Sequence, residues 1–113
     1  MNDLQFTRNQ LIRGGGEKNP SLVESRVKRF VTCHHGVEPH LVAPMYRYAI
    51  AHVLYYRGWS DRQIGSLLHK APSTIKSYRQ AALGYLPRHV KFKRYLSELQ
   101  QYLECGWYRD VIV

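Results

Sequence analysis

Apolar side chains recur along this chain at the three- and four-residue spacing of amphipathic helices, and no stretch alternates as a β-strand does. The clearest period lies in the last third of the chain, at Phe92, Tyr95, Leu96, Leu99, Tyr102 and Leu103. Apolar stripes of this length indicate a helical core. We therefore expect an all-α domain of about five helices, which run from Ser21 to Cys33, Pro44 to Gly58, Ser60 to the turn at Ala71-Pro72, Ser73 to Leu83 and Arg88 to Cys105.

The middle of the chain predicts two short helices joined by a tight turn. Ser60 and Gln63 have the spacing of a capping box, which fixes the start of the first helix. Pro72 forces the residue before it out of the helical region, and Ser73 can cap the second helix. Gly65 costs stability inside a helix and is expected where the second helix crosses within backbone contact. This pattern is typical of a helix-turn-helix.

The second helix of this pair has two faces. Ile75 and Tyr78 fall on the side that closes against Ile64 and Leu68 of the first helix. The opposite side carries small, polar or cationic residues, which are Ser73, Lys76, Ser77 and Gln80. Such groups fit a major groove and bond to phosphates and base edges.

The net charge of +9 is unevenly placed along the chain. Between Pro39 and Ser97 the only acid is Asp61, against ten lysines and arginines. A polyanionic partner is the simplest explanation of this imbalance. Motif and charge together predict that double-stranded DNA is contacted by Arg62, Lys70, Ser73, Thr74, Lys76, Ser77, Arg79 and Gln80.

Two families resemble this chain. The segment from Gly58 to Tyr78 resembles the helix-turn-helix of LuxR-type response regulators. A longer stretch resembles the C-terminal DNA-binding domain of the bacterial replication initiator DnaA, with matching features in the order Val23 to Phe30, Gly36, Tyr46 to Leu54, Ile64-Gly65, Ser73-Thr74-Ile75 and Phe92 to Leu103. The resemblance implies a Trp-repressor-like helical fold that binds DNA, in a small transcription or replication-associated regulator.

The chain departs from the initiator family where that family reads its DNA sites. Lys70-Ala71-Pro72 stands in place of the family's Arg-Asp-His, and Val42-Ala43-Pro44-Met45 in place of its strongly basic loop. The phosphate loop of a nucleotide-binding domain is also absent from the sequence. We therefore expect DNA binding without recognition of initiator boxes.

The alternative function is a protein-interaction or dimerisation module that uses the same fold without binding DNA. The apolar tail from Trp107 to Val113 offers a surface for homodimerisation. A docking role would favour large apolar residues on the outward face of the second motif helix, whereas the residues present there favour nucleic acid. An enzyme is not expected, because the basic half has no carboxylate pair and no nucleophile–histidine arrangement is visible.

Histidine, cysteine and tyrosine are plentiful but predict structural roles. Cys33, His34, His35 and His40 are of the residue types that bind zinc, but the sequence lacks a second spaced pair, so no metal or other cofactor is expected. We expect His34 and His35 to bond to the last carbonyls of the first helix. Most of the nine tyrosines have core spacing, and Tyr55 and Tyr56 are the ones expected in a loop near phosphates.

The remaining expectations concern domain organisation and compartment. Residues 1–20, with Gly14-Gly15-Gly16, are expected to be a flexible lead-in, and residues 21–113 the helix-turn-helix domain. The two cysteines are far apart in the chain, and the sequence has no apolar segment typical of an export signal or of a membrane span. We therefore expect a cytoplasmic protein with reduced thiols.

Overall fold

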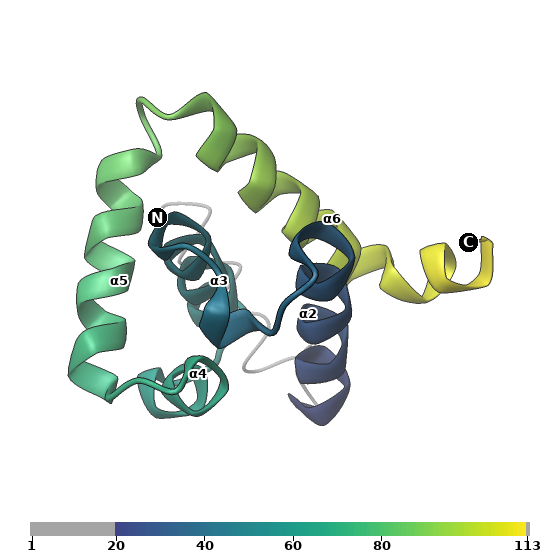
Figure 1. Ribbon diagram of the computed structural model, residues 1–113, viewed down its shortest axis with the longest axis horizontal. Coiled ribbons are helices and arrows are strands. Elements are labelled where there is room, and N and C mark those ends of the chain that lie inside the picture. Colours follow the sequence, from purple (N-terminus) through teal and green to yellow (C-terminus); the bar gives the residue numbers. More distant parts are fainter. Residues whose placement is uncertain (1–19, 113) are drawn as a thin grey trace.

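The computed structural model describes the backbone of residues 20–112 and the side chains of residues 22–104 (Figure 1). This part of the chain contains five α-helices and one 3-10 turn, and no strand. The elements are α2 (Pro20–His35), η1 (Pro39–Leu41), α3 (Pro44–Tyr56), α4 (Asp61–Leu68), α5 (Pro72–Tyr85) and α6 (Val90–Ile112). The expected all-α architecture of about five helices is confirmed. The expected lead-in lies, up to residue 19, outside the described residues.

Helix α3 is the centre of the core. Its residues Ala49 to Leu54 are all buried, and it packs against both α5 and α6, while α2 covers a second side of α6. Phe92 and Leu99 of α6 are fully buried. The apolar stripe that begins at Phe92 and ends at Leu103 is thus buried against α3, and the expected helical core is confirmed.

Local signals in the sequence set several helix boundaries as expected. Pro44 occupies the first turn of α3, where its missing N–H costs no hydrogen bond. Gly36 and Gly58 follow α2 and α3 with φ values of 73° and 100°, a conformation that glycine adopts without strain. At α4, Ser60 Oγ accepts a bond from the Gln63 N–H (3.1 Å) and Gln63 Oε1 accepts one from the Ser60 N–H (2.8 Å). The predicted capping box is confirmed.

Two helices begin one residue before their predicted starts at Ser21 and Ser73, because a proline in each case takes the first helical position. Helix α2 begins at Pro20, so Ser21 lies inside the helix. Helix α5 begins at Pro72, and its N-cap is Ala71, which makes no side-chain cap bond. Ser73 is therefore within the first turn of α5 and stays exposed.

Two predicted helix ends are also wrong. Gly84 lies inside α5, which continues to Tyr85. Helix α6 begins at Val90, with His89 Nδ1 accepting a bond from the Phe92 N–H (3.2 Å), and its backbone remains helical past Gly106 to Ile112. Glycine inside a helix costs only about 1 kcal/mol relative to alanine, so it does not end a helix by itself. The side chains of the expected apolar tail lie outside the described ones.

Among the described helices, none combines the length and the apolar character needed to cross a membrane.

Candidate nucleic-acid interface

Helix α5 lies at one edge of the molecule, opposite α2 in Figure 1. Ile75 and Ala82 on its inner side are fully buried. Its outer side exposes four polar or cationic residues at helical spacing, Ser73, Lys76, Ser77 and Gln80, which we call the reading face. The exposure predicted for these four side chains is confirmed.

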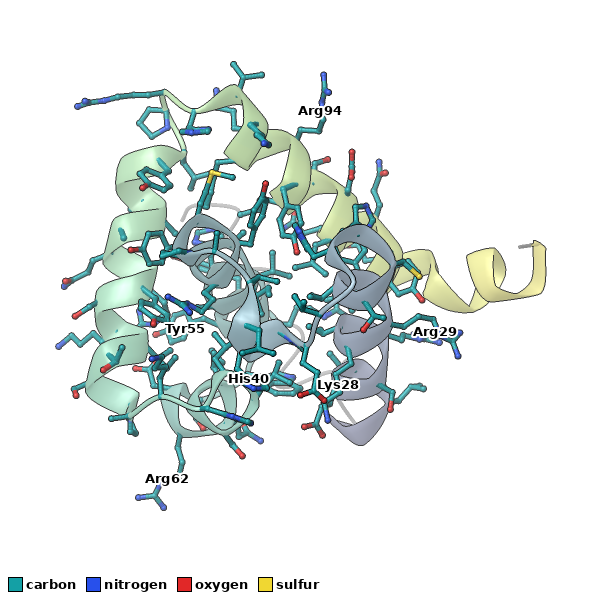
Figure 2. All side chains as sticks on the ribbon, viewed as in Figure 1. Lys28, Arg29, His40, Tyr55, Arg62 and Arg94 are labelled. Atoms are coloured by element: carbon teal, nitrogen blue, oxygen red, sulfur yellow. The ribbon has the colours of Figure 1, made fainter. Side chains whose placement is uncertain are left out.

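The other predicted contact residues surround the reading face. Arg62 is exposed on the first turn of α4 and extends away from the body of the protein (Figure 2). Lys70 is exposed in the turn between α4 and α5, and Thr74 is half-buried on the first turn of α5. No ion pair within the described residues neutralises Arg62, Lys70 or Lys76, so these charges face solvent.

The turn between α4 and α5 is tight and fixed by backbone contacts. His69 ends α4 in the left-handed conformation with φ 58°, and the Lys70 N–H donates to the Gly65 carbonyl oxygen at 2.9 Å. A Cβ at Gly65 would collide with the carbonyl oxygen of Lys70 and would also approach Ile75. The close backbone approach expected at Gly65 is made by the turn that carries Lys70, and not by the backbone of the second motif helix.

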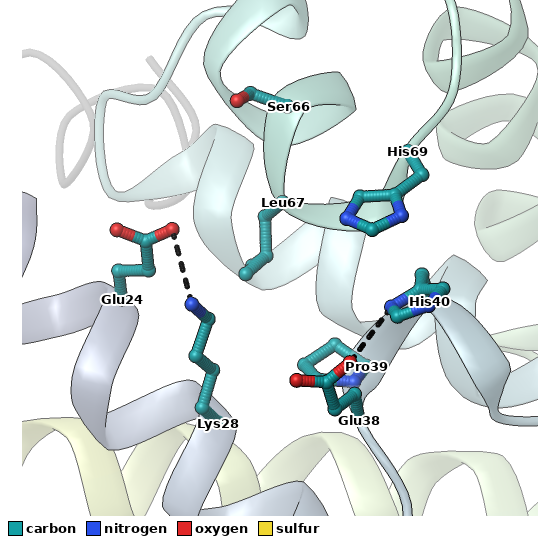
Figure 3. A pocket seen from close by; sticks show the side chains of 8 residues that line it. All are labelled: Glu24, Lys28, Glu38, Pro39, His40, Ser66, Leu67 and His69. Carbon is teal, nitrogen blue, oxygen red and sulfur yellow. Dashed lines mark ion pairs between the residues drawn. The ribbon is translucent and has the colours of Figure 1, made fainter.

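A stacked pair of histidines holds this turn to the connector before α3. The rings of His69 and His40 lie 3.9 Å apart between centroids and are nearly parallel, with 23° between their planes. They border a pocket of about 160 Å³ between α2, η1 and α4, shown in Figure 3. Glu38 Oε2 lies 3.7 Å from Nδ1 of His40. This contact could not be predicted from the sequence, because His40 and His69 are far apart in the chain.

Arg79, which was expected to contact phosphate, is engaged inside the protein. Its Nε–H and Nη2–H donate to the two carboxylate oxygens of Asp61, each at 2.9 Å. Its guanidinium also lies 3.8 Å from the centre of the Tyr55 ring. The hydrogen bond to Asp61 is the main cause that raises the pKa of Arg79. We therefore assign Arg79 to the packing of α5 rather than to the reading face.

The described tyrosines mostly have the predicted core role, with one correction. Tyr55 and Tyr56 end helix α3 instead of standing in a loop. Tyr78 packs on α3, where its ring lies 5.2 Å from that of Tyr48. The reason is that α5 packs along α3 as well as against α4, so one side of α5 faces each neighbour. Tyr95, buried in the core, has a raised pKa because burial disfavours the phenolate.

Of the two histidines at the end of α2, only one bonds to a carbonyl of that helix as expected. The Nδ1–H of His34 donates to the Phe30 carbonyl oxygen at 3.0 Å, as predicted. His35 instead contacts the Tyr95 hydroxyl at 3.3 Å, because its ring turns towards α6. Cys33 is exposed. Within the described side chains, no group of three or more His, Cys, Asp or Glu is arranged to hold a metal ion.

The cluster of Asp61, Arg79 and Tyr55 is the main feature that sequence reasoning missed. A signal was present, since Asp61 is the only acid between Pro39 and Ser97, and a lone carboxylate in a basic region is a natural partner for one cation. In the folded chain that carboxylate is paired with Arg79, and the reading face carries no acidic side chain. Comparisons of the chain with protein-family models, with characterised proteins and with solved structures found no match.

Proposed function

We propose that this protein binds double-stranded DNA through a helix-turn-helix formed by α4 and α5. The observation that carries the proposal is the reading face: Ser73, Lys76, Ser77 and Gln80 are exposed together on a helix whose other side is buried. The first turns of α5 expose no large apolar side chain; Leu83 follows only at its end. Such a face suits a hydrated, charged groove better than an apolar protein surface.

The proposed contacts follow from the position of each side chain. In a helix-turn-helix the second helix enters the major groove with its N-terminal residues next to the bases, and the first helix crosses the backbone. Arg62 on α4 and Lys70 in the turn would then neutralise phosphates. Lys76 and Gln80 would reach base edges, since an amide can bond to adenine in two places and a lysine can bond to guanine.

The Asp61–Arg79–Tyr55 cluster would position the reading face. It joins the first turn of α4, the middle of α5 and the end of α3 through two hydrogen bonds and a ring contact. Paired bonds between a guanidinium and a carboxylate fix geometry as well as distance. The angle between the two motif helices is thereby held before DNA arrives.

We further propose that the protein is a small transcription or replication-associated regulator that does not recognise initiator boxes. Its resemblance to the initiator's DNA-binding domain supports the regulatory role. Ala71 and Pro72 stand where that family has acidic and imidazole readers, and neither side chain can donate or accept a hydrogen bond. The sequence preference would depend on Lys76 and Gln80 instead.

A direct test is a titration of fluorescent duplex of mixed sequence, followed by anisotropy at low salt. Lys76→Gln should weaken binding roughly tenfold, the effect of losing one good contact. Arg29→Gln is the matched control, because it removes the same charge from an exposed side chain of α2 that points away from α5 (Figure 2). It should change affinity little.

Absence of duplex binding at low salt would contradict the proposal. If a stable protein complex were then recovered with the reading face as its interface, the dimerisation or docking alternative would replace it. Equal weakening by Lys76→Gln and Arg29→Gln would show that charge alone, and not the reading face, accounts for the affinity.

A further inference from the structure

A second basic surface lies at the start of α6. Arg88, Lys91, Lys93 and Arg94 fall within seven residues, and all four side chains are exposed. Within the described residues none of them takes part in an ion pair. The first carboxylate on α6 is Glu98, whose Oε2 lies 3.4 Å from Nε2 of His34 on α2. The four cations therefore form a concentrated positive surface.

This second basic surface is separated from the turn of the motif by the whole length of α5. The 14 residues of α5 span roughly 21 Å at a rise of about 1.5 Å per residue. In Figure 1, α4 lies at one end of α5 and the start of α6 at the other. Figure 2 shows Arg62 and Arg94 extending from opposite ends of the molecule.

When a straight duplex is entered by the first turns of α5 alone, it does not reach both the reading face and the second basic surface. A major groove is only about 8.5 Å deep, and a recognition helix contacts bases through its N-terminal residues. With Ser73 and Lys76 in the groove, the C-terminal end of α5 is directed away from that duplex. The cations at the start of α6 then stand beyond the reach of its phosphates.

We propose that the second basic surface binds the phosphates of a second DNA duplex, so that one protein molecule bridges two duplexes. The inference rests on the proposed function, since the first duplex is held by the reading face. Lysine and arginine on an exposed helix turn contact phosphate without reading bases. The second duplex is therefore bound without sequence preference, and its capture weakens steeply with salt.

The test is a bridging assay with one duplex fixed to beads and a second, fluorescent duplex in solution. The wild-type protein should carry the fluorescent duplex to the beads at low salt. The triple variant Lys91→Gln/Lys93→Gln/Arg94→Gln should reduce this capture at least roughly fivefold and leave the anisotropy-measured binding of a single duplex within about twofold, because it leaves the reading face intact. A second triple variant, Arg26→Gln/Lys28→Gln/Arg29→Gln on α2, removes the same charge and should retain capture.

Three outcomes would overturn the proposal. Capture could persist in the α6 variant, or it could fall equally in the α2 variant. Alternatively, sedimentation could show a dimer at the concentrations that bridge, with capture lost in Lys76→Gln and kept in the α6 variant, so that two reading faces hold the two duplexes. If wild-type protein binds a single duplex but captures no second one, only this inference fails. If it binds no duplex at all, the proposed function fails with it.

Discussion

The same substitution at two glycines should shift stability in opposite directions. Gly65→Ala places a methyl group against the carbonyl oxygen of Lys70, in the turn between the motif helices. Gly84→Ala places it in open space on the last turn of α5, where nothing lies within 4 Å. Both changes replace glycine by the best helix former, so helix propensity alone predicts a gain at both positions.

The surroundings of each glycine decide whether its substitution raises or lowers the free energy of unfolding. At Gly84 the gain of about 0.5–1 kcal/mol from lost unfolded-chain freedom should appear in full. At Gly65 the Lys70 carbonyl cannot rotate away like a side chain, because the Lys70 N–H is bonded to Gly65 and the fully buried Ile75 lies 3.5 Å from the new atom. Overpacking typically costs about 1–3 kcal/mol, which exceeds the propensity gain. We expect Gly65→Ala to lower the free energy of unfolding by roughly 1–2 kcal/mol.

Urea unfolding followed by far-UV circular dichroism measures both free energies of unfolding. Gly65→Ala should also weaken duplex binding, since relief of the collision displaces Lys70 and the start of α5. Gly84→Ala lies on the last turn of α5, after the turns that carry the reading face, so it should leave duplex binding close to wild type. A Gly65→Ala protein as stabilised as Gly84→Ala would refute the tight-turn geometry.

Three further predictions follow from the core, the buried histidine and the reading face. The Leu99 side chain is 0% exposed, so Leu99→Ala should lower the free energy of unfolding in urea by about 2–5 kcal/mol. The Leu83 side chain is 54% exposed, so Leu83→Ala should change it by no more than about 0.5 kcal/mol. Equal effects would contradict the packing of α6. Burial, with a smaller effect from a nearby arginine, lowers the pKa of His52 below its ordinary value of 6.5. Below about pH 6.5 the unfolded chain therefore binds more protons than the folded one, and the stability present above that pH is lost as the pH falls. His52→Gln should flatten this dependence when the free energy of unfolding is measured across pH, and an unchanged slope would refute the prediction. Selection from random duplexes should return a motif unlike initiator boxes, or a broad preference, that Lys76→Ala and Gln80→Ala alter; recovery of initiator boxes by both variants would contradict the assigned reading face.

The parts of the fold that could be predicted from sequence depend on neighbours in the chain. The capping box of Ser60 and Gln63 and the first-turn position of Pro44 are local, so the starts of α3 and α4 were foreseen. The reading face follows from helical spacing once Ile75 is placed inward. The ends predicted at Leu83 and Cys105, each followed by a glycine, were wrong because glycine lowers helix stability only modestly and neighbouring residues override it.

Contacts between distant residues could not be predicted in the same way. Arg79 meets Asp61 eighteen positions away, and only the folded chain shows that this arginine is withdrawn from the reading face. His40 and His69 come together because η1 passes beside the motif turn. The reading face and the second basic surface lie towards opposite ends of α5 because of the direction of that helix, which no local pattern specifies. DNA binding itself stays a prediction.

The most direct measurement of the central claim is the salt dependence of duplex binding. Association constants of wild type and of Arg62→Gln/Lys70→Gln/Lys76→Gln should be compared from about 50 mM to about 200 mM salt, where each phosphate contact contributes roughly 0.9 to the slope of log K against log salt. The account predicts steep wild-type dependence, and a slope that is shallower by roughly 1.8 in the triple variant, because Arg62 and Lys70 meet phosphate while Lys76 meets a base edge. Identical slopes for the two proteins, or no duplex binding by wild type, would contradict it.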